Sequence, residues 1–191
     1  MVLPLTYYGN PVLRQKGETI ENTTPELTQL IEDMFDTMKE YRGIGLAAQQ
    51  IGQAIQLTVI DIRAVEDRPS TLEINGEEAD PHSIMPLVLL NPEIEHLGPE
   101  ETGPEGCLSF PEIYGDISRP GRIRIKARNV KGKLTDFICG GLLSRCIQHE
   151  TDHLHGILFI DRMDRETKTE LKEKLDELLE QTKDELAKPE V

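Results

Sequence analysis

Two histidines spaced four residues apart, with a glutamate directly after the first, occur in the segment His149-Glu150-Thr151-Asp152-His153. Residues i and i+4 share one face of an α-helix, so both imidazoles can reach one metal ion. Glu150 would lie beside a ligand, within reach of a water molecule on the metal. The segment therefore predicts a metal-binding helix. Two ordinary histidines on an amphipathic helix would give the same pattern, so a metal site requires further support.

A catalytic site of this kind needs a third protein ligand and an open coordination position. Position 159, where one class of zinc protease places a third histidine, is a phenylalanine. Glu173 and Glu177 are downstream carboxylates, but they lie in a Glu/Lys-rich segment that is typical of a solvated helix. Cys107 is the other candidate, because a thiolate flanked by small residues can approach a metal ion. A solitary cysteine is most often a buried apolar residue, so both alternatives remain open at this point.

The composition fits one globular domain. The chain has 191 residues, of which 37% are hydrophobic and 29% are charged. Its formal net charge of −14 argues against general binding to nucleic acids or to anionic membranes. Three cysteines without an export signal favour a reduced, cytoplasmic setting, and no apolar run approaches the roughly 20 residues of a membrane span. We therefore expect a cytoplasmic protein without membrane or direct nucleic-acid partners.

Hydrophobic periodicity predicts helices and short strands along the chain. The expected helices cover residues 23–41, 141–156 and 165–187, and the expected strands cover residues 57–62, 87–90, 122–128 and 134–139. Together they predict an α+β domain with antiparallel strands around a central metal-binding helix, plus a C-terminal helix. We expect this single domain to span residues 1–187, followed by a loose tail at 188–191. The last helix carries a narrow leucine stripe, which favours packing along the domain.

Three separated motifs make the chain similar to a known family. They are GIGLAAQQ at Gly43–Gln50, EGCLS at Glu105–Ser109 and QHETDHLHG at Gln148–Gly156. In these motifs and their order, the chain resembles the peptide deformylases from Leu5 to about Arg162. The second motif contains Cys107, so the resemblance supplies the missing third ligand.

The resemblance implies a metal-dependent hydrolase. Cys107, His149 and His153 would hold one divalent ion with one water. Fe(II) is the expected metal, and Zn(II) or Ni(II) would also suit these ligands. The implied reaction removes the formyl group from N-formylmethionine at the start of newly synthesised polypeptides and releases formate.

The resemblance also implies roles for residues around the metal. Glu150 would accept the water proton and deliver it to the leaving amine. The side-chain amide of Gln50 and the backbone N–H of Leu108 would stabilise the charge on the former carbonyl oxygen. Gly43 and Gly45 would let the backbone pass close to the substrate.

Substrate-pocket assignments are less specific. Ile44, Leu142 and Cys146 are candidate walls for the methionine side chain, although each would also suit ordinary core. Arg145 is expected either to point outward or to approach the substrate backbone.

Glu105 and Asp152 are candidate hydrogen-bond partners for the ligating histidines, and His155 is expected at the surface. The polar segment 63–83 would form a surface loop or short hairpin. It would lie away from the metal or border the peptide groove.

Two other functions remain possible on the sequence alone. One is a peptidase that cleaves internal peptide bonds, with Glu173 or Glu177 as the third ligand and Cys107 unused. The other is a catalytically silent relative that serves as a binding protein, although the presence of all the site residues counts against it. A contact with the ribosome is left open, because the acidic C-terminal helix is poorly suited to bind RNA.

Overall fold

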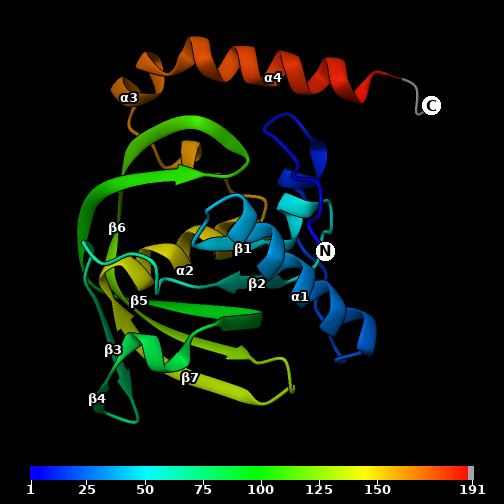
Figure 1. Ribbon diagram of the computed structural model, residues 1–191. Coiled ribbons are helices and arrows are strands. Elements are labelled where there is room, and N and C mark those ends of the chain that lie inside the picture. Colours follow the sequence, from blue (N-terminus) through cyan, green and yellow to red (C-terminus); the bar gives the residue numbers. More distant parts are fainter. Residues whose placement is uncertain (189–191) are drawn as a thin grey trace.

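The computed structural model of the protein describes residues 1–188 (Figure 1). Its helices are α1 (Pro25–Glu40), α2 (Gly141–Leu154), α3 (Arg165–Glu170) and α4 (Lys172–Leu186). Its strands are β1 (Gly45–Ala47), β2 (Leu57–Ile60), β3 (Ser70–Ile74), β4 (Glu77–Ala79), β5 (Leu87–Cys107), β6 (Phe110–Arg128) and β7 (Leu134–Gly140). Within residues 1–188, none of the helices combines the length and the apolar character that crossing a membrane requires. The remaining tail residues, 189–191, lie outside the described part of the chain.

All seven strands belong to one antiparallel sheet with the order β1-β2-β5-β6-β7-β3-β4. The long β5–β6 hairpin dominates it and bends over α2 in Figure 1. On β6, Ile123 and Ile125 are buried while Arg122 and Arg124 face outward. This alternation agrees with the sequence pattern, because successive side chains of a strand point to opposite faces. The arrangement confirms the α+β class.

Helix α2 is the centre of the molecule, since every residue in it except Gly141 and Arg145 is buried. Its first turn is held by the segment that precedes β3. The carbonyl of Pro69 accepts a hydrogen bond from the backbone N–H of Leu142, and the Ser70 hydroxyl accepts one from Leu143, both at 3.0 Å. These bonds satisfy N–H groups that a helix start leaves without partners.

Part of the polar segment 63–83 belongs to the sheet. Strands β3 and β4 form a hairpin within it, and β3 pairs with β7 in a register that places Thr71 opposite Gly140. Arg68 also lines a small cavity beside Glu150. Arg68 thus borders the small cavity, while the β3–β4 hairpin lies at the opposite end of the sheet from β1, so each alternative holds for a different part of the segment.

The C-terminal helix is interrupted at Leu171, where α3 ends and α4 begins. Helix α4 covers the N-terminal segment, as Figure 1 shows, and buries Leu175 and Thr182. Leu179 lies so close to Gly9 that a Cβ on Gly9 would be 3.1 Å from its Cδ1. Packing along the domain through the leucine stripe is thus the arrangement found.

Candidate metal centre and active site

Three potential ligands converge between α2 and the tip of the β5–β6 hairpin. Cys107 is the last residue of β5, and His149 and His153 lie one turn apart on α2. The ligand atoms of the three residues lie within 4.8 Å of one another, and Cys107 Sγ is 3.3 Å from His153 Nε2. A thiolate and two imidazoles at this separation fit a divalent transition metal.

The carboxylate alternative for the third ligand has no support in the fold. Glu173 and Glu177 are exposed on α4. Among residues 1–188, the group with metal-ligand spacing is the one formed by Cys107, His149 and His153. His155 is exposed, as expected, and its Nδ1 lies 2.9 Å from the Thr151 carbonyl.

Glu105 orients the first histidine. Its Oε2 lies 2.9 Å from His149 Nδ1, which leaves Nε2 of that ring for a metal ion. Arg119 binds the same carboxylate through Nε at 2.5 Å and Nη2 at 2.9 Å. Burial disfavours the charged form of Glu105, but the hydrogen bonds from Arg119 and His149 outweigh it, so the pKa of Glu105 is lowered. The sequence prediction for Glu105 agrees with this geometry.

Within residues 1–188, the Asp152 carboxylate makes no hydrogen bond to His149 or His153, so that part of the prediction is wrong. The same carboxylate accepts hydrogen bonds from Arg119 Nη1 at 2.7 Å and from Arg162 Nε at 2.5 Å. Arg119, which is only 2% exposed, was not predicted from the sequence. No local pattern marks this arginine, because the carboxylates that neutralise it come from other elements.

Arg145 leaves α2 toward the β5–β6 hairpin, is half-buried, and also lines a small cavity beside Glu150. Its guanidinium donates to the carbonyls of Glu101 and Ile117, each at 2.7 Å, and to Glu105 Oε1 at 3.0 Å. The side chain therefore fastens the metal helix to the hairpin that carries Cys107.

Glu150 is buried beside the candidate metal ligands, and its Oε2 has no hydrogen-bond partner within the described chain. Burial raises the pKa of this carboxyl to about 7. Gly45 on β1 makes room for it, because a Cβ at that position would lie 2.4 Å from Glu150 Oε1. Gly43 similarly makes room for Leu108, whose Cδ1 would be 2.8 Å from such a Cβ. The two glycines thus accommodate protein side chains as well as lining the cavity.

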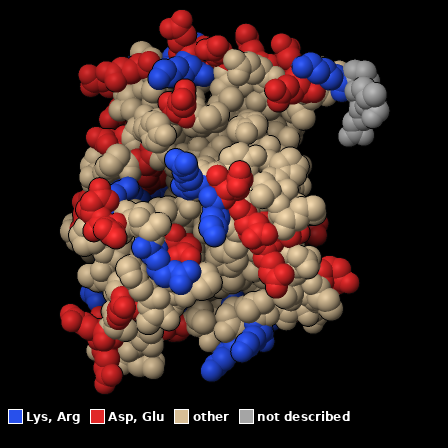
Figure 2. All heavy atoms as spheres, viewed as in Figure 1, with Lys and Arg blue, Asp and Glu red and all other residues tan. Residues whose placement is uncertain are grey.

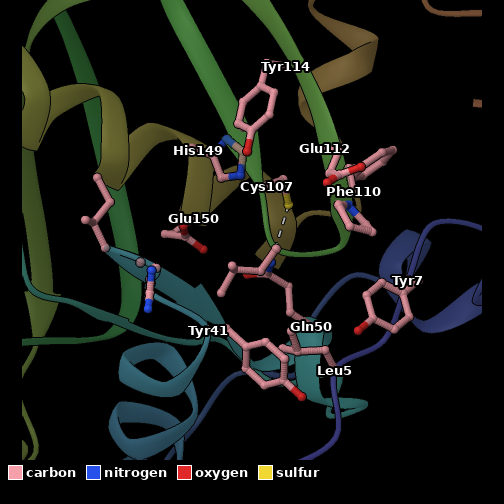
Figure 3. A pocket seen from close by; sticks show the side chains of 17 residues that line it. Leu5, Tyr7, Tyr41, Gln50, Cys107, Phe110, Glu112, Tyr114, His149 and Glu150 are labelled. Carbon is pink, nitrogen blue, oxygen red and sulfur yellow. Dashed lines mark hydrogen bonds between the residues drawn. The ribbon is translucent and has the colours of Figure 1, made fainter. Parts of the chain in front are cut away.

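Gln50 is held in one orientation. It lies in the short 3-10 helix Ala48–Ile51, and its Oε1 accepts a 2.9 Å hydrogen bond from the Ala47 N–H. The amide nitrogen is thereby turned toward Cys107 Sγ at 3.4 Å and Ser109 Oγ at 3.3 Å. Figure 3 shows this amide below Cys107, across the cavity from Tyr114. The side chain therefore places its N–H donors beside Cys107, at the wall of a cavity.

Two cavities meet at Glu150 and His149. The larger, about 530 Å³, is a groove that also contains Gln50, Cys107 and Leu108 (Figure 3). The smaller, about 90 Å³, is lined by the three predicted pocket residues Ile44, Leu142 and Cys146, and by Arg68 and Arg145. The structure therefore brings together the residues that the three sequence motifs contribute. Arg68 was missed because it comes from the polar segment outside them.

Replacing Gly45 with Ala tests this close packing. We expect the new methyl group to displace the Glu150 carboxylate and to lower kcat by about 10²-fold, the effect of a misplacement of roughly 1 Å. Metal content and the melting temperature should stay near the wild-type values, since the metal ligands are untouched. Wild-type kcat in this variant would show that Glu150 does not need its observed position.

Comparison with known proteins agrees with this geometry. A family model described as polypeptide deformylase matches residues 2–169. This chain belongs to the polypeptide deformylase family. It is 47% identical to the peptide deformylase of Opitutus terrae over 172 residues, which cover 88% of each protein. It is 43% identical to the peptide deformylase of Methylacidiphilum infernorum over 178 residues, or 93% of each.

Solved deformylase structures share the fold over almost the whole length. Arabidopsis thaliana peptide deformylase 1B has a TM-score of 0.82 at 33% identity, with 98% of this chain and 96% of that chain covered. The Plasmodium falciparum peptide deformylase has a TM-score of 0.82 at 32% identity, with 98% and 100% covered. The chain is therefore a metal-dependent deformylase, an enzyme that removes formyl groups from the N-terminus of polypeptides.

Proposed function

We propose that this deformylase acts on N-formylmethionyl peptides at a single divalent metal ion held by Cys107, His149 and His153. The convergence of one thiolate and two imidazoles within 4.8 Å, beside the buried Glu150, carries the proposal. The small cavity next to them would take the methionine side chain. Its walls include the apolar residues Ile44 and Leu142.

The protein groups around the metal have separate tasks in this reaction. A divalent ion supplies a Lewis acid, which makes a water molecule acidic enough to react near neutral pH. Glu150 takes the proton from the attacking water and later gives it to the leaving amine. The Gln50 amide and the Leu108 N–H donate to the carbonyl oxygen as negative charge develops there. Each such preorganised donor typically contributes about 3 kcal/mol.

Formyl selectivity follows from the crowding around the reacting carbon. A formyl carbon carries only hydrogen, whereas an acetyl carbon carries a methyl group. Gln50, Cys107 and Glu150 border the same cavity, and Gln50 and Glu150 are buried. Rejection of acetyl-Met peptides is therefore part of the proposal.

Formate release from a formyl-Met peptide tests the function directly. Protein loaded anaerobically with Fe(II) should release formate and leave an otherwise intact peptide in the mass spectrum. Peptide fragments without formate would instead indicate an internal peptidase. Folded, metal-loaded protein that neither releases formate nor cleaves the peptide would indicate a catalytically silent relative.

Replacing Cys107 with Ala separates the two candidate ligand sets. We expect metal affinity to fall at least about tenfold, because the thiolate is one of three protein ligands. The control is Cys139→Ala, which removes a buried thiol on β7 outside the site. Metal content measured after equilibration with a competing chelator reports the effect. Equal metal affinity in the two variants would rule out Cys107 as a ligand.

We propose Fe(II) as the metal, with Zn(II) and Ni(II) as alternatives that suit the same ligands. Both ferrous iron and the Cys107 thiolate are open to oxidation, so the iron form should lose activity faster in air than under argon. The zinc and nickel forms should last longer. Equal half-lives of the iron form in air and under argon would contradict this expectation.

A further inference from the structure

Two unpaired charges of opposite sign border the large groove. Arg42 follows α1, and Glu112 lies near the start of β6. Both side chains are exposed, and neither forms an ion pair or side-chain hydrogen bond within residues 1–188. Figure 3 shows Glu112 and Tyr114 on one side of the groove and Tyr41, the neighbour of Arg42, on the other. Their charges are therefore free to act on whatever occupies the groove.

The backbone at both positions is unusual for these residue types. Among residues 1–188, four non-glycine residues have positive φ, namely Arg42 at 56°, Asn75 at 55°, Asn91 at 50° and Glu112 at 58°. Asparagine tolerates this left-handed conformation, whereas arginine and glutamate are much less common there. Arg42 also occupies a position just after a helix end where glycine is usual. The two charged side chains are thus kept where their backbone is strained, and both line the same groove.

The groove is continuous with the reaction centre. Ile44, Gly106, His149 and Glu150 line both the groove and the small cavity. A peptide with its first side chain in the small cavity therefore extends into the groove. In an extended chain successive side chains point to opposite sides, so its second and third side chains face different walls.

Charge is distributed unevenly around this opening. The whole chain carries a formal net charge of −14. Figure 2 shows basic side chains at the centre of this face beside a run of acidic ones, with many further acidic side chains along its edges. Arg42 lines the groove, while Arg68 and Arg145 line the adjoining small cavity. Arg145 is paired with Glu105, and Glu105 and Glu150 line the same small cavity, so the attraction for a negatively charged peptide side chain comes from Arg42 in the groove.

We propose that Arg42 and Glu112 select formylated peptides by the charge of their second and third residues. Arg42 favours an acidic side chain at one of these positions, and Glu112 favours a basic side chain at the other. This inference rests on the proposed function, because it takes the first residue to be seated in the small cavity. It adds a substrate class to that function, namely formylated peptides with an acidic residue at one of the two positions and a basic residue at the other.

Nine formyl-Met peptides, with Glu, Gln or Lys at each of the two positions, provide the test. At each position and at low salt, the peptide with the favoured charge should have a kcat/KM up to about fivefold higher than the peptide with Gln. This is the upper range for an exposed charge pair. The preferences should have opposite signs at the two positions and shrink in high salt. Arg42→Gln should abolish the acidic preference alone, and Glu112→Gln the basic preference alone.

Further variants separate side-chain charge from backbone conformation. Arg42→Lys should retain the acidic preference and Arg42→Glu should invert it. Arg42→Gly relieves the left-handed backbone, so it should lose the preference without lowering the melting temperature. Lys131→Gln, in the exposed β6–β7 turn, controls for the change in net charge and should leave both preferences unchanged.

The outcomes distinguish this inference from the function on which it rests. Equal kcat/KM values for all nine peptides, or preferences that survive Arg42→Gln and Glu112→Gln, would overturn the charge selection and leave the deformylase function standing. Failure of the wild-type enzyme to deformylate even the peptide with Gln at both positions would contradict the proposed function itself.

Discussion

Glu150→Gln is expected to lower kcat by about 10²–10⁴-fold, the usual contribution of a general acid–base group. The amide has nearly the shape of the carboxylate but cannot accept the proton of the attacking water. It also carries no charge at a buried position. The variant should therefore fold at least as stably as the wild type and keep its metal.

Formate release, metal content and the melting temperature, measured together, check this result. The matched control is Glu177→Gln, an exposed position on α4 that the peptidase alternative would require as a ligand. The control should keep both activity and metal. Activity near the wild-type level in Glu150→Gln would show that Glu150 is not the acid–base group. Metal loss in Glu177→Gln would favour the peptidase alternative.

Arg119→Met should destabilise the protein by about 3–5 kcal/mol, because it leaves buried carboxylates without their cation. Arg119 is 2% exposed and is hydrogen-bonded to both Glu105 and Asp152. For a chain of this size the loss corresponds to a fall in melting temperature of about 6–20 °C. Metal affinity should also fall by about 10–100-fold, since Glu105 would no longer be fixed against His149.

Arg124→Met provides the control on the same strand. Arg124 forms a two-point ion pair with Asp136, but the two side chains are 43% and 44% exposed. An exposed pair contributes only about 0–1 kcal/mol, so the melting temperature should change little. Calorimetry of both variants at one metal concentration makes the comparison. Equal shifts would show that the buried network contributes no more than a surface pair.

Local spacing explains how the candidate metal site follows from the sequence. His149, Glu150 and His153 are fixed relative to one another by one helical turn, so their geometry follows from the sequence once α2 forms. Cys107 required the motif around it, because its approach to α2 depends on the path of the β5–β6 hairpin. Arg119 carried no signal at all, since its two carboxylate partners lie on β5 and α2.

Strand β5 is much longer than the sequence predicts. The sequence predicts a strand over residues 87–90, whereas β5 continues through Asn91-Pro92 to Cys107. The pairing shifts its register between Leu90 and Glu93, and Asn91 adopts a positive φ of 50° there. Its side chain also donates a 2.7 Å hydrogen bond to the Ile20 carbonyl. A β-bulge thus absorbs residues that would otherwise end a strand.

The order of strands in the sheet has a consequence for how the enzyme is made. Strands β5 and β6, and β6 and β7, are neighbours in sequence and pair with each other. Strand β3 joins the sheet by pairing with β7, which is synthesised later. Contacts between distant parts of a chain form slowly, because the loop between them must first be closed. During synthesis, the β3–β4 hairpin therefore remains unpaired at its β7 edge until the chain has grown past Gly140. The same event brings Pro69 and Ser70 to the start of α2. Completion of the sheet and fixation of the catalytic helix are thus expected to be one late, cooperative folding step.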